Sequence, residues 1–474
     1  MILLRPARPT RWGVAMDEQT LAWCQRLIRC RSVTDEGTRA IAELCARELL
    51  APVGIEARLI PSLAAGPAQV NLLATIAGSD RTAAPLVFNT HLDTVPPGIP
   101  ELWTECGGDP FAATVNVDRI YGLGAADTKL DFVAKVTALI GAKPRRTVWL
   151  VATFGEEQGL LGAKELAAAG VLPRGALAFI GEPSRLEVIT AHKGLMVFEL
   201  RVDFPPAAQQ SISAKAQRLR FAGRAAHSST PALGRNAIGL ALSALAARSQ
   251  LGVVSISGGD AVNKVPANCE VVLNGEVPPE IPDAEAVGGV ENSLHAIPYP
   301  AIALLARFTT ELQQFADHTG PLEPDYASPT LTCNPGLISS TADSLTLDFE
   351  LRPPPSLDLD RVREGVAAIV ARLRADANSL ELTLCERRAN PGFRGALDSA
   401  TVELAMAALA RAGLPLSTGV KAGCTEAGVY AAAGLKPVVF GPGPSTGVIH
   451  APNEHNFLAD VDGATRFYRE LLRS

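Results

Sequence analysis

Two of the seven histidines follow short apolar runs that have the composition of buried strands. His91 ends the run Leu-Val-Phe-Asn-Thr, and His450 lies a few residues beyond an apolar run that ends at Phe440. In an open α/β sheet, ligands bind at the carboxyl ends of the strands. An imidazole there is a candidate metal ligand, and Asp93 could hold the second ring nitrogen of His91. The alternative is a loop histidine beside a solvated aspartate.

Carboxylates occupy three more positions of this kind. Asp127 ends a glycine-rich turn before a helix-like segment, Glu156 and Glu157 follow the apolar run 147–153, and Glu182 follows the next apolar run. Taken singly, Asp127 could be a helix N-cap and the glutamate pair a solvated turn. Because neighbouring side chains of an extended segment point in different directions, one glutamate could bind a cation while the other faces a substrate.

Together these residues make a nitrogen and oxygen donor set with two imidazoles and three carboxylates. Such a set suits zinc or a similar divalent ion, with enough oxygens for two ions bridged by one carboxylate. Two ions would lower the pKa of a water from about 16 towards about 7, and Glu156 could then act as the general base. The candidate ligands are His91, Asp127, Glu157, Glu182 and His450.

The strands that must position these residues alternate with helix-like segments. Short, mostly apolar runs occur at 71–76, 86–89, 147–153 and 176–180, as expected for strands buried on both faces. Helical patterns lie before, between and after them, at 17–54, 130–139, 163–169, 402–412 and 463–472. This alternation predicts an α/β fold with a mainly parallel sheet.

From about residue 192 the pattern changes to strand pairs, an Ala/Leu-rich helix and a later strand-helix-strand unit, which together are typical of a small α+β sandwich. We therefore expect one domain to interrupt another. The predicted catalytic domain comprises 1–191 and 394–474, and the interrupting domain comprises 192–393 with an insertion near 278–330.

Composition excludes several classes of protein. The 474 residues carry 43 basic and 49 acidic side chains, a net charge of −6, so clustered basic residues for nucleic acid are missing. Every long apolar run is interrupted by charge, which argues against a membrane span, and residues 1–12 are too polar for a secretory signal. Eight cysteines without a CxxC pair favour reduced thiols and a cytoplasmic location.

Five motifs occur in the order found in one known family. They are HLDTVPPG from His91, GLGAADTK from Gly122, TFGEEQG from Thr153, GEP from Gly181 and HAPNEH from His450. With these motifs the chain resembles the dinuclear zinc amidohydrolases and peptidases of metallopeptidase family 20, which include acetylornithine deacetylase, succinyl-diaminopimelate desuccinylase and glutamate carboxypeptidase. The resemblance implies a zinc-peptidase-like catalytic domain interrupted by a ferredoxin-like lid and dimerisation domain, and hence a homodimer.

The resemblance also implies roles for the motif residues. His91 and Glu182 would bind one ion, Glu157 and His450 the other, and Asp127 would bridge the two. Asp93 would orient His91, and Glu156 would be the general base.

Four further residues gain roles only through the resemblance. His227, in the segment GRAAHS, would reach the partner subunit's active site and stabilise an oxyanion, and Asn263 would contact substrate. Arg352 would grip a substrate carboxylate, and Thr425 would lie near the acyl end of the substrate. From the residues alone, His227 could end a hairpin, Asn263 could sit in a turn and Arg352 could pair with a structural acid.

The chain departs from the family pattern at two of these motifs. Lys129 is followed by Leu and Asp where members commonly have two glycines, and Thr425 is followed by Glu426 where Asp is usual. The longer side chain of Glu426 leaves the identity of the substrate open.

These residues predict a metal-dependent hydrolase that cleaves the amide bond of N-acyl amino acids or small peptides. Two divalent ions are expected, with zinc favoured and cobalt or manganese as alternatives. A dipeptidase or carboxypeptidase would use the same metals. Readings from other classes are a metal-binding protein without catalysis and a plain α/β binding protein without tightly bound metal.

Overall fold

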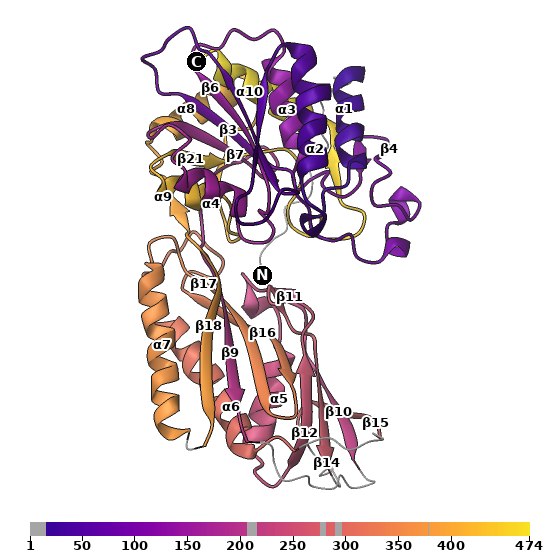
Figure 1. The fold of residues 1–474 in the computed structure, drawn as a ribbon, viewed down its shortest axis with the longest axis vertical. Helices are drawn as coiled ribbons and strands as arrows, with labels where there is room; N and C mark the ends of the chain where they lie inside the picture. The colour runs from indigo at the N-terminus through magenta and orange to yellow at the C-terminus, as the bar shows by residue number, and fades with distance from the viewer. Residues whose placement is uncertain (1–15, 206–215, 275–280, 290–295, 378) are drawn as a thin grey trace. The chain divides into compact units, whose positions relative to one another are not determined.

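The computed structural model describes residues 16–205, 216–274, 281–289, 296–377 and 379–474, so the segment tested for a secretory signal lies outside the described residues. Two compact units are present (Figure 1). Unit 1 comprises Met1–Ala191, Arg394–Val420 and Thr425–Ser474, and unit 2 comprises His192–Phe393 and Lys421–Cys424.

Unit 1 is built on a nine-stranded sheet with the order β1-β2-β6-β3-β7-β21-β8-β19, in which β20 also pairs with β8. Its centre is parallel and consists of β3 (Leu86–His91), β6 (Val148–Thr153), β7 (Leu177–Gly181) and β21 (Lys436–Val439). The remaining strands are β1 (Ala57–Pro61), β2 (Val70–Ile76), β8 (Val188–His192), β19 (Phe393–Arg394) and β20 (Thr418–Lys421). The predicted mainly parallel α/β sheet is thus confirmed.

Helices cover both faces of this sheet, which is why its central strands are mostly apolar and mostly buried. One face packs into a single apolar core with α1 (Glu18–Arg29), α2 (Arg39–Leu44), α3 (Lys129–Leu139), α8 (Ala400–Arg411) and α10 (Leu458–Leu472). The other face carries α4 (Leu161–Ala168) and α9 (Ala427–Ala432), which pack together (Figure 1).

A small three-stranded sheet ties together two distant parts of unit 1. It has the order β22-β5-β4, with β4 at Thr114–Asn116, β5 at Arg119–Tyr121 and β22 at His455–Phe457. The pair β5·β22 joins the segment just before Asp127 to the segment just after His450. Two of the predicted ligands are therefore anchored by the same strand pair.

Unit 2 contains an eight-stranded antiparallel sheet with the order β15-β10-β14-β12-β16-β17-β9-β18. Its strands are β9 (Leu195–Asp203), β10 (Gln217–Ala222), β12 (Gly252–Gly258), β14 (Asn268–Asn274), β15 (Ala284–Gly289), β16 (Thr332–Ser340), β17 (Ser344–Arg352) and β18 (Glu381–Asn390). The helices α5 (Ala237–Ala246), α6 (Tyr299–His318) and α7 (Leu359–Asp376) share one apolar core with the sheet. The α+β character predicted for this part of the chain is confirmed.

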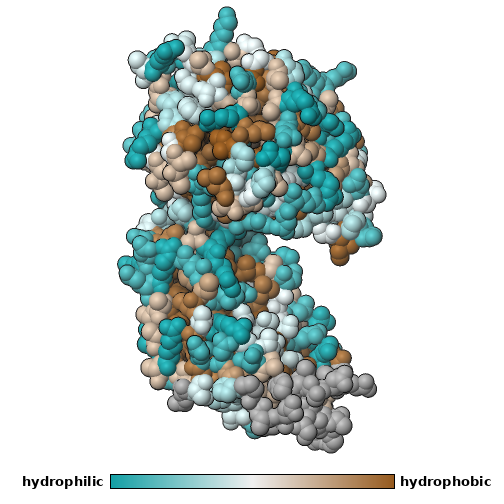
Figure 2. All heavy atoms as spheres, in the orientation of Figure 1, coloured by the Kyte–Doolittle hydropathy of each residue, from teal (hydrophilic) through white to brown (hydrophobic). Residues whose placement is uncertain are grey.

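The outer surface mixes polar and apolar residues. Figure 2 shows hydrophilic residues interspersed with smaller hydrophobic areas on the face it presents. Within the described residues, none of the helices combines the length and apolarity needed to cross a bilayer.

A charged pair lies inside the core of unit 1. Lys135 Nζ contacts Asp131 Oδ2 at 2.5 Å, one turn away on α3, and both side chains are inaccessible to solvent. Lys135 also donates to the backbone oxygen of Asn89, while Tyr468 donates to Asp131 from α10 at 2.6 Å. A buried charge is tolerated only with such partners, so this network joins α3, β3 and α10 below the edge that carries His91.

We expect Lys135→Met to lower the free energy of unfolding by about 3–5 kcal/mol, because Asp131 would keep its charge in the core without a counter-charge. Urea denaturation followed by circular dichroism measures this difference. The exposed Lys143→Met is the matched control and should change stability by less than about 0.5 kcal/mol. Equal denaturation midpoints for the two variants would contradict the importance of the pair.

Candidate metal centre

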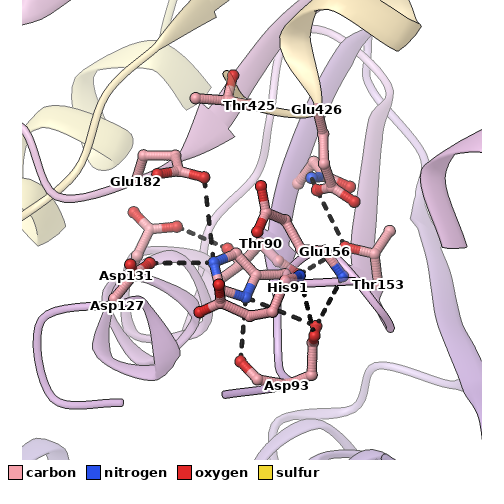
Figure 3. A network of polar contacts seen from close by, with 12 residues as sticks. Thr90, His91, Asp93, Asp127, Asp131, Thr153, Glu156, Glu182, Thr425 and Glu426 are labelled. Atoms are coloured by element: carbon pink, nitrogen blue, oxygen red, sulfur yellow. Dashed lines mark hydrogen bonds and ion pairs between the residues drawn. The ribbon is translucent and has the colours of Figure 1, made fainter. Parts of the chain in front are cut away.

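The register of the parallel strands brings three predicted residues to one edge of the sheet. His91, the last residue of β3, lies opposite Thr153, the last residue of β6, and its neighbour Thr90 lies opposite the end of β7. Residues that follow β6 and β7 must therefore emerge beside His91. Glu156 follows β6 through Gly155, whose φ of +64° favours glycine. Figure 3 shows His91, Glu156 and Glu182 grouped at this edge.

Asp127 faces both histidines. Its Oδ1 lies 3.1 Å from His91 Nε2, and its Oδ2 lies 3.3 Å from His450 Nε2. His450 Nε2 is also 3.1 Å from Glu157 Oε1, and His91 Nε2 is 4.0 Å from Glu182 Oε1. The two oxygens of one carboxylate thus face two different histidines.

The donor atoms form two groups in which all members lie within 4.8 Å of one another. They are His91, Glu156 and Glu182 in one group, and Asp127, Glu157 and His450 in the other. Four ligands at about 2.1 Å around a tetrahedral zinc ion lie about 3.4 Å apart, which is close to the separations around Asp127. The nitrogen and oxygen donors present therefore fit two divalent ions, with Asp127 able to serve both.

Distance alone places Glu156 among the donors of the first group. Its predicted role as a general base, rather than as a ligand, remains a proposal. The five predicted metal ligands are brought together in unit 1, with Asp93 beside them.

Carboxylates outnumber the histidines at this site, and this excess of negative charge shifts the pKa values of its residues. Burial by itself would lower the pKa of His91, but the carboxylates of Asp127 and Asp93 raise it well above its usual value. Burial also opposes protonation of His450, yet Glu157 and Asp127 raise its pKa to about 11. Burial raises the pKa of Glu156 well above its usual value, with neighbouring carboxylates adding to the effect. Cations at this site would relieve the same repulsion that otherwise retains protons.

Asp93 holds the backbone that carries the glutamate pair. Its Oδ1 accepts the backbone N–H of Glu156 at 3.1 Å and its Oδ2 accepts that of Glu157 at 3.2 Å. Thr34 Oγ1 also donates to Asp93 at 2.9 Å, and His91 Nδ1 lies 3.6 Å from Asp93 Oδ1. Asp93 therefore contacts four neighbouring groups at once, of which the sequence analysis anticipated only the contact with His91 (Figure 3).

Glu454 holds the backbone at Asp127 in place, and the sequence analysis gave it no role. The backbone N–H groups of Ala126 and Asp127 both donate to Glu454 Oε1, at 2.9 and 3.0 Å. Burial raises the pKa of Glu454 to about 8, and the neighbouring Asp127 carboxylate contributes. The signal was present in the motif HAPNEH, which carries Glu454 four residues after His450.

Thr425 and Glu426 lie at the start of α9 in the same unit. Thr425 Oγ1 accepts the N–H of Ala427 at 3.2 Å, and Glu426 accepts hydrogen bonds from Asn89 and, at 3.0 Å, from Thr153 Oγ1. Burial raises the pKa of Glu426 to about 7. Glu426, one of the two departures from the family pattern, is thus bound to β3 and β6, and substrate contact by Thr425 remains a prediction.

The other predicted residues lie in unit 2. His227 is exposed in the short strand β11 (Ala226–His227), with Nδ1 2.7 Å from Ser229 Oγ. Asn263 accepts the backbone N–H of Ser228 at 3.1 Å, just before β13 (Lys264–Val265). Arg352 is buried at the end of β17 and donates to Glu350 Oε1 at 2.5 Å.

Comparison with known proteins gives a family assignment. The sequence model of the peptidase family M20/M25/M40 matches residues 87–474. The chain belongs to this family. Acetylornithine deacetylase of Photorhabdus laumondii is 32% identical over 228 residues, which are 43% of this chain and 52% of that protein. The chain thus spans about half the length of the curated relatives it matches.

Solved structures support the fold. Aminoacylhistidine dipeptidase from Vibrio alginolyticus aligns with a TM-score of 0.63 at 16% identity and covers 96% of each chain. A Bacillus subtilis protein described as a dinuclear metal binding peptidase of the M20 family aligns with a TM-score of 0.51 at 13% identity, covering 96% of each chain. Family membership is as the motifs predicted, and the predicted fold class is confirmed.

We expect Asp93→Asn to weaken binding of zinc by about 10- to 100-fold, because the amide cannot accept both glutamate N–H groups and orient His91. Competition with a chromophoric chelator measures the affinity. The exposed Asp118→Asn is the matched control, since it removes the same charge outside the site. Unchanged affinity in Asp93→Asn would show that the backbone positions do not depend on this carboxylate.

Proposed function

We propose that the chain is a metal-dependent hydrolase that cleaves the amide bond of N-acyl amino acids. The observation that carries this proposal is the carboxylate of Asp127, whose two oxygens face two separate groups of donor atoms with Glu156 beside them. Membership of a peptidase family and the similarity to an acetylornithine deacetylase support it.

The metals and residues would divide the work as the resemblance implies. His91 and Glu182 would hold one ion and Glu157 and His450 the other, with Asp127 shared. Two bound divalent ions, with zinc favoured over cobalt or manganese, supply Lewis acidity that polarises a carbonyl and lowers the pKa of water. Glu156 would take a proton from the attacking water at its carboxylate and deliver it to the leaving amine.

Unit 2 would supply the contacts to the substrate. His227 would donate to the developing oxyanion, and Asn263 would contact the substrate, as Thr425 would from unit 1. Arg352 has five N–H donors, so its bond to Glu350 leaves capacity for a substrate carboxylate. The cysteines of the described residues are thiols outside any disulfide, which supports the proposed cytoplasmic location.

A dipeptidase or carboxypeptidase activity is the second candidate, favoured by the similarity to a dipeptidase structure. Rates on a panel of N-acetyl amino acids and dipeptides, each with zinc, cobalt and manganese, separate the two activities. Higher kcat/KM on N-acetyl amino acids supports the deacylase, and higher kcat/KM on dipeptides supports the alternative. A metal-binding protein without catalysis predicts turnover of neither class.

We expect Glu156→Ala to lower kcat by about 10²- to 10⁴-fold while two metal ions per chain remain bound, because the base is lost and the proposed ligands are kept. Steady-state kinetics together with elemental analysis test both parts. The exposed neighbour Gln158→Ala is the control and should keep its rate. Wild-type turnover in Glu156→Ala would overturn the role of the base, and loss of one ion would make Glu156 a ligand.

We expect Arg352→Lys to raise KM by about 10- to 100-fold for substrates with a free carboxylate, because lysine keeps the charge but loses the planar fork. The same substrates with the carboxylate converted to a carboxamide are the control. Their KM should be nearly the same in wild type and variant. An equal rise in KM for both series would assign Arg352 a purely structural role.

A further inference from the structure

The eight-stranded sheet of unit 2 consists of two halves with the same internal strand order. The first half has the order β15-β10-β14-β12 and includes α5, and the second half has the order β18-β9-β17-β16 and includes α6 and α7. In chain order the second half is strand, helix, two strands, helix, strand, which is the ferredoxin-like arrangement. Within the described residues, the first half repeats this arrangement without the second helix.

The two halves meet edge to edge about an internal pseudo-twofold axis. The edge strands β12 and β16 pair antiparallel, with Ser257 opposite Ser339 and Gly258 opposite Ile338. The helices that precede these strands also touch, because Tyr299 of α6 donates to the backbone oxygen of Ala246 at the end of α5, at 2.6 Å. One apolar core contains residues of all three helices and of both halves.

The pairing of β12 with β16 uses the strand edge at which each half could otherwise have paired with a second copy of the chain. An unpaired edge strand is a template for a further strand, and natural proteins block such edges with charge and bulges. The outer strand β18 follows that rule. It has a register shift between Glu386 and Arg388, and its Glu386 and Arg387 form ion pairs with Arg363 and Glu199, each at 2.6 Å.

Polar contacts across the junction connect the residues predicted to bind substrate. In the first half, Ser228 follows His227 and donates its N–H to the backbone oxygen of Asn263 at 3.1 Å. Ser228 Oγ also donates to Glu350 Oε1 of the second half at 2.6 Å, and Arg352 Nη2 lies 3.4 Å from Ser228 Oγ. His227, Asn263 and Arg352 are thus linked through one buried serine and one buried glutamate of the same chain.

A second buried side chain supports the same link. Asn334 of β16 donates to the backbone oxygens of Val262 and Lys264, which flank Asn263, at 3.1 and 2.8 Å. Asn236, the N-cap of α5, donates to the backbone oxygen of Pro335 at 2.7 Å. The loop that carries Asn263 therefore rests on the second half of the sheet within one copy of the chain.

We propose that unit 2 is a fused pair of halves that assembles His227, Asn263 and Arg352 in cis, so that a single copy of the chain is the complete catalyst. This inference rests on the proposed function for the roles of the three residues, and it replaces the homodimer expected from the family resemblance. The histidine that the resemblance assigns to a partner subunit is supplied by the first half of the same chain.

Mixing two inactive variants tests the inference. In a homodimer that exchanges His227 between subunits, an equimolar mixture of Glu156→Ala and His227→Ala would regain about a quarter of wild-type activity, because half of the dimers would have one intact site. Assembly in cis predicts no recovery above the two variants measured alone. Recovery after unfolding and joint refolding, which allows any exchange, would overturn the inference.

Two measurements decide the inference independently of activity. Light scattering at assay concentration should give the mass of one chain, and a stable dimer would overturn the proposal. A Ser257→Cys, Ser339→Cys pair, at exposed and directly opposed positions, should form a disulfide that migrates as a monomer under non-reducing conditions, and each single variant is its control. A dimeric band specific to the double variant would show that the halves meet between chains.

The outcomes also separate this inference from the proposed function. If Glu156→Ala alone keeps its activity, the proposed function fails, while the mass and the disulfide still decide whether the halves are joined within one chain. If Glu156→Ala is inactive but the mixture recovers, the proposed function stands and the cis assembly fails.

Discussion

Electrostatic repulsion among carboxylates is the constraint on which the structure of unit 1 depends. Asp127, Glu157 and Glu182 meet around two histidines at a buried sheet edge, with Glu156 and Asp93 beside them. Two like charges 4 Å apart repel each other by about 4 kcal/mol at an effective dielectric constant of 20. Such a cluster persists only where cations or protons offset the repulsion and where the backbone holds the side chains in place. The raised pKa values of His91 and His450 show that, without cations, protons on the histidines would offset this repulsion.

The second requirement is met by carboxylates that face the backbone. Asp93 accepts the N–H groups of Glu156 and Glu157, and Glu454 accepts those of Ala126 and Asp127. Each acid thereby fixes a loop whose own acid belongs to the proposed ligand set. Below this layer, the buried Asp131 and Lys135 connect α3 to β3 and α10. These buried acids thus have three different partners, namely the proposed ions, the backbone that presents the ligands and the buried Lys135.

The sequence predicts most of this arrangement because the strands and the residues that follow them can be recognised from short segments of the chain. The apolar runs that became β2, β3, β6 and β7 were recognisable from burial on both faces, and parallel strands bring their carboxyl ends to one edge. That rule alone gathers His91, Glu157 and Glu182, although their roles remain proposals. Glu454 and the partners of Lys135 could not be predicted, since these contacts join residues far apart in the chain. No periodicity specifies which distant residues will share an interior.

The sheet of unit 2 was also beyond local prediction, for a related reason. Strand and helix segments were recognisable there, but strand order depends on which edges meet, and the pair β12·β16 joins segments separated by α6. The fused arrangement has a consequence that a symmetric dimer lacks. In an isologous dimer both copies of a half must be identical, so each must carry every functional loop. Within one chain the halves can differ. Here the first half carries His227 and Asn263 and shows no second helix among its described residues, whereas the second half has α7 and carries Arg352. The buried hydrogen bond from Ser228 to Glu350 then fixes the position of one half relative to the other. In a dimer, contacts between subunits would have to do this.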